Sequence, residues 1–235
     1  MLLDVSDVSF TYPGSSVEAV SGLSFHLPET GVIGLVGMNG SGKSTLLSLI
    51  SGARTPTAGE ISFAGARPTE RVSLLNTMPL RGNEDLPEFL TGSELLRLYA
   101  SLYGVDVDEE VARRLAARYQ LEGKMGSLLE DLSHGAKKKV QFLCALLLRR
   151  RLTILDETLN GVDFQSVARA KEDLRALGRE GLVVVCTHDQ FLVQDLVSRF
   201  LVLDRGALRL DVVAAEVERE YGSLTKMMSQ LIYRK

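Results

Sequence analysis

Residues 37–45 hold the combination of side chains with the most specific chemistry in this chain. They read Gly-Met-Asn-Gly-Ser-Gly-Lys-Ser-Thr, fit the pattern G-x-x-x-x-G-K-[ST], and lie between the apolar runs 32–36 and 46–50. In such a loop the glycines allow a tight turn that aims backbone N–H groups inward. The helix that follows contributes the positive end of its dipole. The pattern therefore predicts a strand–loop–helix unit that binds the phosphates of a nucleotide.

Two side chains of this loop have predicted roles of their own. We expect Lys43 to reach the β- and γ-phosphates and Ser44 to bind Mg²⁺ through its hydroxyl. A Gly/Ser-rich loop without a ligand is the alternative, and a match at every required position between two apolar runs disfavours it. The residues expected to contact the nucleotide are Gly37, Asn39, Gly40, Ser41, Gly42, Lys43, Ser44 and Thr45.

Two acidic residues and a histidine follow apolar runs that are typical of core strands. Asp156 and Glu157 come directly after the run 152–155, and His188 comes shortly after the run 182–186. We expect Asp156 to bind Mg²⁺, directly or through water, and Glu157 to polarise an attacking water. We expect His188 to hydrogen-bond the γ-phosphate, because parallel sheets bind ligands at the carboxyl ends of their strands. The alternatives are a solvated acidic turn for the two carboxylates and an ordinary surface histidine.

The hydrophobic pattern predicts an α/β fold. Apolar runs separated by helical segments indicate a parallel sheet covered on both faces, whereas alternation in residues 3–25 indicates antiparallel strands with one buried face. From about residue 87 to 150 the pattern is helical, with capping-box spacing at Thr91 and Glu94 and a helix start after Ser133. Further strands are predicted at residues 60–63, 72–75, 152–155, 182–185, 200–203 and 207–210, and a terminal helix at residues 213–232.

Composition narrows the class of protein. The 235 residues are 45% hydrophobic and 24% charged, which is typical of a globular chain with one large domain or two small ones. A formal net charge of −3 gives no electrostatic reason to expect nucleic acid as a partner. Cys144 and Cys186 lie in apolar runs and are expected to be reduced core residues. No secretory signal is expected at the N-terminus, and no apolar run approaches the ~20 residues that span a bilayer.

Several further motifs resemble those of one family. Residues 132–136, Leu-Ser-His-Gly-Ala, resemble the signature LSGGQ and precede a predicted helix, and residues 160–163 resemble the loop after the acidic strand in that family. Tyr12 resembles its adenine-stacking aromatic residue, and residues 187–189 resemble its switch-histidine segment. Together with the phosphate loop, this order resembles the ATP-binding subunit of an ABC transporter, most similar in length to the short subunits of bacterial exporters.

The resemblance implies a fold and an assembly. The fold is a P-loop NTPase of ABC type, with a mixed sheet core, an antiparallel β subdomain and an inserted α-helical subdomain. Residues 1–235 would form one domain, with its core in about 1–86 and 151–235 and the helical insertion in about 87–150. Two subunits, either two copies or one copy and a homologue, would pair head to tail with ATP between them. Each ATP would lie between the phosphate loop of one subunit and Ser133 and Gly135 of the other, and Asp163 would contact the partner.

The resemblance also implies a function. ATP and Mg²⁺ would be the cofactors, with Tyr12 against the adenine, and hydrolysis would power transport through separate transmembrane subunits. The chain would then lie at the cytoplasmic face of a membrane. The segment 79–90 would form part of the groove that receives a transmembrane subunit, the alternative being an ordinary surface loop.

Two departures from the family pattern bear on activity. The family usually carries a sensing glutamine after the strand predicted at residues 72–75, but the nearby residues here are Asn76 and Thr77, of which Asn76 has a shorter amide. In the signature, His134 and Ala136 replace glycine and glutamine. Because Glu157 and His188 are both present, we expect an active ATPase that is slow or depends on its partner.

Two other functions compete with transport. A soluble mechanochemical ATPase of the same superfamily usually carries two such domains, long coiled coils or basic inserts, and none is visible in this sequence. A regulatory module that binds nucleotide with little hydrolysis is suggested by the missing glutamine.

The lysines at residues 137–139 stand at the start of a predicted helix, where the helix dipole is unfavourable for cations. Their position therefore indicates a purpose other than helix stability.

Overall fold

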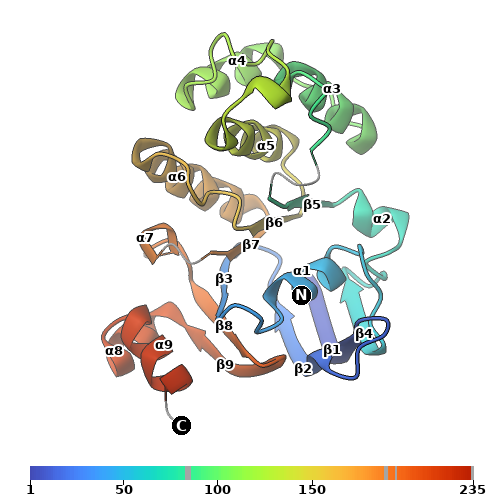
Figure 1. Ribbon diagram of the computed structural model, residues 1–235, viewed down its shortest axis with the longest axis vertical. Coiled ribbons are helices and arrows are strands. Elements are labelled where there is room, and N and C mark those ends of the chain that lie inside the picture. The colour runs from blue at the N-terminus through green and yellow to red at the C-terminus, as the bar shows by residue number, and fades with distance from the viewer. Residues whose placement is uncertain (83–85, 188–189, 194, 234–235) are drawn as a thin grey trace.

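Two β-sheets organise the chain (Figure 1). The computed structural model describes residues 1–82, 86–187, 190–193 and 195–233. A three-stranded antiparallel sheet has the order β2-β1-β4, and a six-stranded sheet has the order β5-β6-β7-β3-β8-β9. The strands are β1 (Leu3–Thr11), β2 (Glu18–Leu27), β3 (Gly31–Gly37), β4 (Ala58–Phe63), β5 (Thr77–Leu80), β6 (Leu152–Asp156), β7 (Leu182–Cys186), β8 (Arg199–Asp204) and β9 (Ala207–Val213).

Within the larger sheet, β5, β6, β7, β3 and β8 pair in parallel, and β9 closes one edge antiparallel to β8. Parallel neighbours need long crossover connections, which the helices supply. The helices are α1 (Lys43–Ile50), α2 (Arg71–Leu74), α3 (Gly92–Tyr103), α4 (Glu109–Arg118), α5 (His134–Leu148), α6 (Phe164–Glu180), α7 (Gln190–Val193), α8 (Ala214–Tyr221) and α9 (Leu224–Tyr233), with a short 3₁₀ turn at Leu129–Asp131.

Alternate residues of the larger sheet face two different hydrophobic cores, as the two-residue period of a strand requires. In β3, Ile33 and Leu35 join a core that contains α1 and the antiparallel sheet. Val32 and Val36 join the opposite core, with α5, α6 and the C-terminal helices. Both faces are therefore covered, which explains why the strands read as continuous apolar runs.

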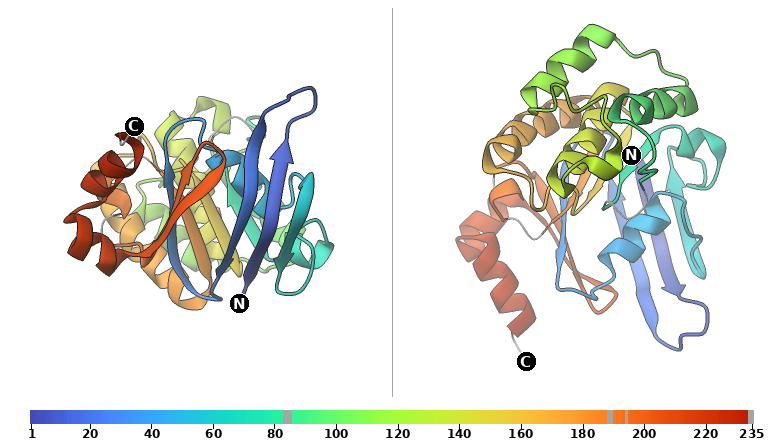
Figure 2. Two further views of the ribbon diagram at one scale, coloured as in Figure 1. Left: turned by 90° about the horizontal axis from the view of Figure 1, so that it is seen from below. Right: turned by 45° about the horizontal axis from the view of Figure 1, so that its top comes forward.

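The helices α3, α4 and α5 form a layer at the top of Figure 1, while α8 and α9 lie at the opposite end. The right-hand view in Figure 2 keeps this separation. The capping box at Thr91 is present, with the Glu94 N–H donating to Thr91 Oγ1 at 3.2 Å and the Thr91 N–H donating to Glu94 Oε2 at 2.8 Å. Asp108 and Ser133 cap α4 and α5 through their side-chain oxygens. The predicted helix starts in this segment are confirmed.

The strand predicted at residues 72–75 is wrong. These residues belong to α2 and the turn that ends it, where the N–H groups of Leu74 and Leu75 donate to the carbonyls of Glu70 and Arg71. Val72 and Leu74 are exposed and contribute no buried strand face. The strand begins at Thr77 instead, and as β5 it is an edge strand that tolerates a proline.

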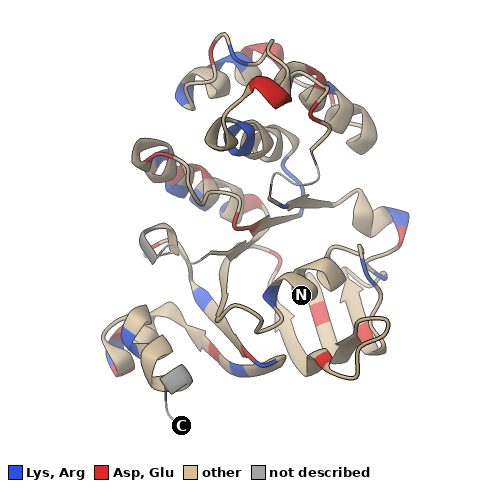
Figure 3. Cartoon of the chain, in the orientation of Figure 1, with Lys and Arg blue, Asp and Glu red and all other residues tan. Residues whose placement is uncertain are grey.

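The single terminal helix predicted at residues 213–232 is also wrong. It is divided into α8 and α9 at Gly222, whose φ of 73° lies in the left-handed region that ends helices. Among the described residues, no helix combines the length and the apolar character that crossing a bilayer requires. The helices α4, α6 and α8 each carry charges of both signs (Figure 3).

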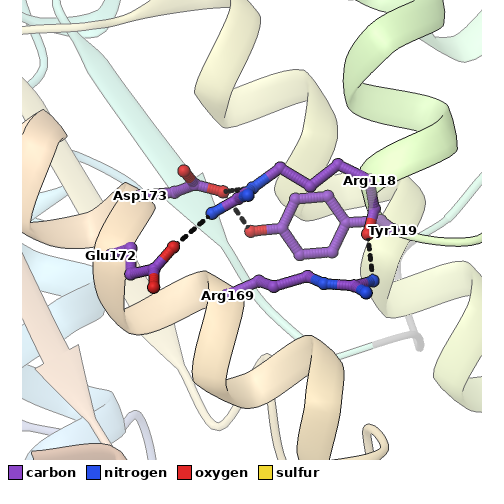
Figure 4. A network of polar contacts seen from close by, with 5 residues as sticks. All are labelled: Arg118, Tyr119, Arg169, Glu172 and Asp173. Atoms are coloured by element: carbon purple, nitrogen blue, oxygen red, sulfur yellow. Dashed lines mark hydrogen bonds and ion pairs between the residues drawn. The ribbon is translucent and has the colours of Figure 1, made fainter.

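A polar network joins the helical layer to α6 (Figure 4). The Tyr119 hydroxyl, on a side chain that is 1% exposed, donates to Asp173 Oδ2 at 2.5 Å. Arg118 Nε donates to the same oxygen at 3.0 Å, and its Nη2 donates to Glu172 at 2.6 Å. Arg169 also donates to the Arg118 carbonyl. Burial, followed by the Asp173 carboxylate, raises the pKa of Tyr119 far above its ordinary value.

This network predicts a measurable contribution to stability. Asp173→Ala leaves the buried Tyr119 hydroxyl and Arg118 without their shared acceptor, so the free energy of unfolding in urea should fall by about 1–3 kcal/mol. Tyr119→Phe removes one donor and should cost about 1 kcal/mol. Glu110→Ala breaks an exposed ion pair with Arg114 and should change stability by less than about 0.5 kcal/mol. Equal effects of Asp173→Ala and Glu110→Ala would contradict this assignment.

Candidate nucleotide-binding and hydrolysis site

The phosphate loop lies between β3 and α1, as its sequence predicts. Gly42 has a φ of 100°, and a Cβ there would lie 2.5 Å from the Ala19 carbonyl oxygen. A Cβ on Gly37 would lie 2.3 Å from the Leu203 carbonyl oxygen. Both positions therefore require glycine, because only glycine combines this backbone conformation with so close an approach.

The chemistry of this loop fits a bound polyanion. Lys43 is 7% exposed, and its Nζ donates to the Gly37 and Met38 carbonyls at 2.9 and 2.8 Å, so the ammonium group lies across the loop. Helix α1 begins at Lys43, directly after Gly42, with no side-chain cap and no acidic residue in its first turn. Ser41 Oγ is buried and, within the described residues, finds no hydrogen-bond partner. A cation, uncapped N–H groups and an unpaired hydroxyl are the groups that phosphates satisfy.

Strand register brings the predicted acidic residues to this loop. Asp156, at the end of β6, pairs with Cys186, and Cys186 pairs on its other side with Leu35 of β3. The carboxyl ends of the three strands therefore meet at one edge. Burial raises the pKa of the Cys186 thiol, as does Asp156 beside it, while nearby Lys43 lowers it. Cys144 is also buried and free, and burial raises its pKa to about 12, so both cysteines are core residues as expected.

The backbone turns away from the direction of β6 at Glu157, where it has a strained conformation. Its φ of 53° lies in the left-handed region, which costs a non-glycine residue about 1–3 kcal/mol. Two neighbouring bonds hold this turn: the Glu157 N–H donates to the Cys186 carbonyl at 2.9 Å, and Thr158 Oγ1 donates to the Leu80 carbonyl at 2.8 Å. The turn therefore takes the Glu157 side chain out of the alternation of β6.

Asn160 fixes the Glu157 carboxylate, a role that sequence reasoning missed. Its Nδ2 donates to Glu157 Oε2 at 3.1 Å, and its Oδ1 accepts from Thr187 Oγ1 at 2.8 Å. One amide thus joins the acidic turn to the segment that follows β7. No spacing rule marks Asn160, because the contact depends on how two loops meet. The predicted His188 lies outside the described residues.

The lysines at the start of α5 attach that helix to the acidic loop. Lys138 Nζ donates to the Asn160 carbonyl at 2.6 Å and to the Glu157 carbonyl at 3.4 Å. Lys139 pairs with Asp163 at 2.6 Å, and Lys137 pairs with Glu88. The attraction of these partners offsets the unfavourable interaction between the lysines and the helix dipole. The lysines therefore serve to hold the start of α5 against the acidic loop and Glu88.

The signature-like residues lie apart from the phosphate loop. Ser133 caps α5 by accepting from the Ala136 N–H at 3.3 Å, and Gly135 lies close to the Gly161 carbonyl. In Figure 1, α5 lies with α3 and α4 in the helical layer, whereas α1, the helix that follows the phosphate loop, lies beyond β6 and β7. Asp163 caps α6 by accepting from the Ser166 N–H at 2.9 Å, so within this copy its carboxylate serves the helix and Lys139.

Tyr12 lies beside the helix of the phosphate loop. Its hydroxyl is 3.0 Å from Thr45 Oγ1, and the Arg54 guanidinium lies 4.8 Å from its ring centroid. Phe10 supports the ring edge-on at 5.0 Å between centroids. The ring is 37% exposed, which leaves part of its surface for a ligand.

A cavity of about 310 Å³ opens beside the loop between α1, β5 and β6. Ser44 and Asp156, the predicted Mg²⁺ ligands, both line it, and oxygen donors of this kind suit Mg²⁺. Asn76 and Thr77, the residues nearest the predicted place of the family's glutamine, do not line it. Asn76 Nδ2 donates to the Val72 carbonyl of α2 at 2.8 Å, and Thr77 begins β5. The residue that follows β5 into the cavity is Arg81.

The fold and this site define a phosphate-loop nucleotide-binding domain. Residues 20–160 match the family described as ABC transporter. The chain belongs to this family, and it forms an ATP-binding domain of the ABC ATPase class. The recognised family and fold class are confirmed.

Individual relatives agree. The chain is 32% identical over 190 residues to the cytochrome c biogenesis ATP-binding export protein of Cupriavidus pinatubonensis, covering 80% of this chain and 83% of that protein. It is 32% identical to the Nod factor export ATP-binding protein I of Rhizobium etli, covering 87% of this chain and 66% of that protein. It spans 14% of the mouse organic anion transporter ABCA8B, at 28% identity, covering 93% of this chain.

Solved structures show the same fold. An ATP-binding subunit of an ABC transporter has a TM-score of 0.87 and 28% identity, covering 98% of this chain and 99% of that one. A dimeric ATP-binding cassette in a post-hydrolysis state with ADP and Pi has a TM-score of 0.79 at 21% identity, covering 90% of this chain and 98% of that one.

The Asn160 contacts predict a split between binding and turnover. Asn160→Ala and Asn160→Asp both remove the donor to Glu157, so kcat should fall roughly 10-fold, as expected for one lost charge-assisted hydrogen bond. The dissociation constant for ATP should stay within about twofold, because the Asn160 side chain bonds to Glu157 and Thr187 and to no phosphate-loop residue that the structure describes. Asn160→Asp keeps the size and the acceptor for Thr187, and wild-type turnover in this variant would show that the donated bond is unimportant.

The environment of Asp163 predicts that the stability of the fold depends on pH. Partial burial raises its pKa, but Lys139 and Ser166 outweigh that effect and lower it to about 2 from 3.8. A carboxyl with a lowered folded pKa stabilises the fold above the unfolded pKa and loses that effect as pH falls from about 4 to about 2. Asp163→Asn keeps the helix cap. It should therefore be less stable than wild type in urea at pH 6, with the difference shrinking towards pH 2.5. A difference independent of pH would contradict the pairing.

Proposed function

We propose that this chain binds ATP at residues 37–45 and hydrolyses it to drive transport through separate transmembrane subunits. The observation that carries this proposal is the meeting of Lys43, Asp156 and Glu157 at the carboxyl ends of β3, β6 and β7. In our proposal the whole chain is a single domain, with residues 87–150 inserted as its helical part.

The nucleotide is held by the loop and by Tyr12. Its phosphates lie against the N–H groups from Gly37 to Thr45, Asn39, Gly40, Ser41 and Gly42 among them, and against Lys43, which exchanges its carbonyl partners for phosphate oxygens. The exposed part of the Tyr12 ring contacts the adenine, while Arg54 supports the ring from its own side. Mg²⁺, held by Ser44 and Asp156, supplies positive charge that neutralises the phosphates during hydrolysis.

Glu157 acts as the general base. The strained turn and the Asn160 amide hold its carboxylate in one orientation, ready to accept a proton from the attacking water. His188 is proposed to hold the γ-phosphate. The signature residues Ser133 and Gly135 complete the site from a second subunit, since they stand at the start of α5, a helix of the layer that β6 and β7 separate from α1 in Figure 1. Asp163 would then contact that partner as well as Lys139.

The proposal of membrane attachment rests on the similarity of this chain to two bacterial relatives. The two bacterial relatives are described as export ATP-binding proteins. We propose that this chain likewise works at the cytoplasmic face of a membrane and pairs with a second copy or a homologous subunit. A regulatory module with little hydrolysis is a weaker candidate, because Asn160 holds the carboxylate of Glu157, the proposed base. A soluble mechanochemical ATPase is weaker because both bacterial relatives are described as export proteins.

Two variants test the site. Lys43→Ala should abolish ATP binding. Glu157→Gln should keep binding but lower phosphate release by about 100-fold or more, the usual contribution of a general base. Turnover that survives Glu157→Gln would refute the base assignment.

The same variants test the assembly. With ATP, Glu157→Gln should dimerise in light scattering, because hydrolysis no longer reopens the site, and Lys43→Ala should remain monomeric. Ser133→Ala should weaken this ATP-dependent dimer. Solubilised membranes should yield an integral membrane protein bound to the chain, and recovery of none would count against transport.

A further inference from the structure

The cavity beside the phosphate loop is lined by an arginine side chain that has no role in the nucleotide binding and hydrolysis proposed above. Its described lining includes two charged side chains, Asp156 and Arg81. Asp156 is accounted for as a Mg²⁺ ligand. Arg81 follows β5 directly, and its place in the fold suggests an explanation.

The register of β5 and β6 fixes where the Arg81 backbone lies. Leu80 pairs with Leu155 in parallel, so the next residues along the two strands are Arg81 and Asp156. The Leu80 carbonyl is bound by Thr158, which follows Glu157 directly. The Arg81 backbone therefore lies beside Asp156. The residue before it, Leu80, is hydrogen-bonded to the acidic turn.

The guanidinium is held loosely in this structure. Within the part of the chain that the structure describes, Arg81 Nη2 donates a hydrogen bond to Ser51 Oγ at 3.4 Å, near the upper limit for such a bond. Ser51 ends α1, and Ser44, Ser48 and Ser51 line the same face of that helix. Ser44 lies about 10 Å from Ser51 along the helix, at the phosphate end of the cavity. Rotation of the flexible Arg81 side chain can carry its charge from one end towards the other.

We propose that Arg81 is a nucleotide-sensing residue that binds the terminal phosphate of ATP. With ATP present, the guanidinium leaves Ser51 and turns towards Ser44, where it donates hydrogen bonds to γ-phosphate oxygens. An arginine suits this position because its planar fork forms paired, charge-assisted hydrogen bonds with phosphate. ADP lacks that phosphate, so Arg81 distinguishes the two nucleotides. This inference rests on the proposed function of the loop.

Binding of ATP and ADP in EDTA, measured by calorimetry, tests the inference without hydrolysis or metal. Arg81→Met keeps the length of the side chain but removes its donors, so it should weaken ATP binding about 10-fold, the usual loss for a charge-assisted hydrogen bond, and leave ADP binding within about twofold. Arg81→Lys keeps the charge and should retain part of the preference for ATP. Arg97→Met, at an exposed arginine on α3, should change neither constant.

The outcomes separate the two proposals. If neither nucleotide binds wild type, in EDTA or with Mg²⁺, the proposed function of the loop fails. If both bind and Arg81→Met leaves the ratio of the two constants unchanged, the inference about Arg81 is wrong while the proposed function of the loop stands. A loss of ATP and ADP binding by equal factors would also overturn the inference, because it would indicate general damage to the cavity.

Discussion

The parallel alignment of β6, β7 and β3 is the constraint on which the site depends. Strands that run in the same direction end at the same edge, so residues far apart in sequence meet there. The register places Asp156 beside Cys186 and Cys186 beside Leu35, shortly before the phosphate loop. The two hydrophobic cores hold this sheet from both faces and fix the register, because a one-residue slip would turn every buried side chain to the other face.

The helical layer is fastened to the same region by charge. Lys138 and Lys139 bind the loop that carries Glu157, Asn160 and Asp163. Arg118 and Tyr119 bind Asp173 of α6, the helix that follows this loop. The helical layer therefore contacts both parts of one continuous loop–helix segment. A movement of the acidic loop would reach α5 through the partly buried Lys139–Asp163 ion pair, which solvent weakens less than an exposed pair, and through the Lys138 hydrogen bonds to backbone carbonyls.

The strongest local patterns were sufficient to predict much of this arrangement. The phosphate loop, the apolar strands and the capped helices each follow from short-range rules, and the structure has them where they were expected. The errors arose where local preference was weak. Residues 72–75 are apolar enough for a strand, but they form α2, since Val72 and Leu74 have no core to enter there. That shift moves the residue after the strand from Asn76 to Arg81.

The sequence by itself determined the class of chemistry. Glycines at fixed spacing, a lysine and acidic residues after apolar runs are required by phosphate binding whatever surrounds them. Only the tertiary structure decided that Asn160 holds Glu157, that the lysines of α5 bind the acidic loop, and that Arg81 shares a cavity with Ser44 and Asp156. These contacts join segments distant in sequence, and they depend on strand register and loop packing, which no local pattern encodes.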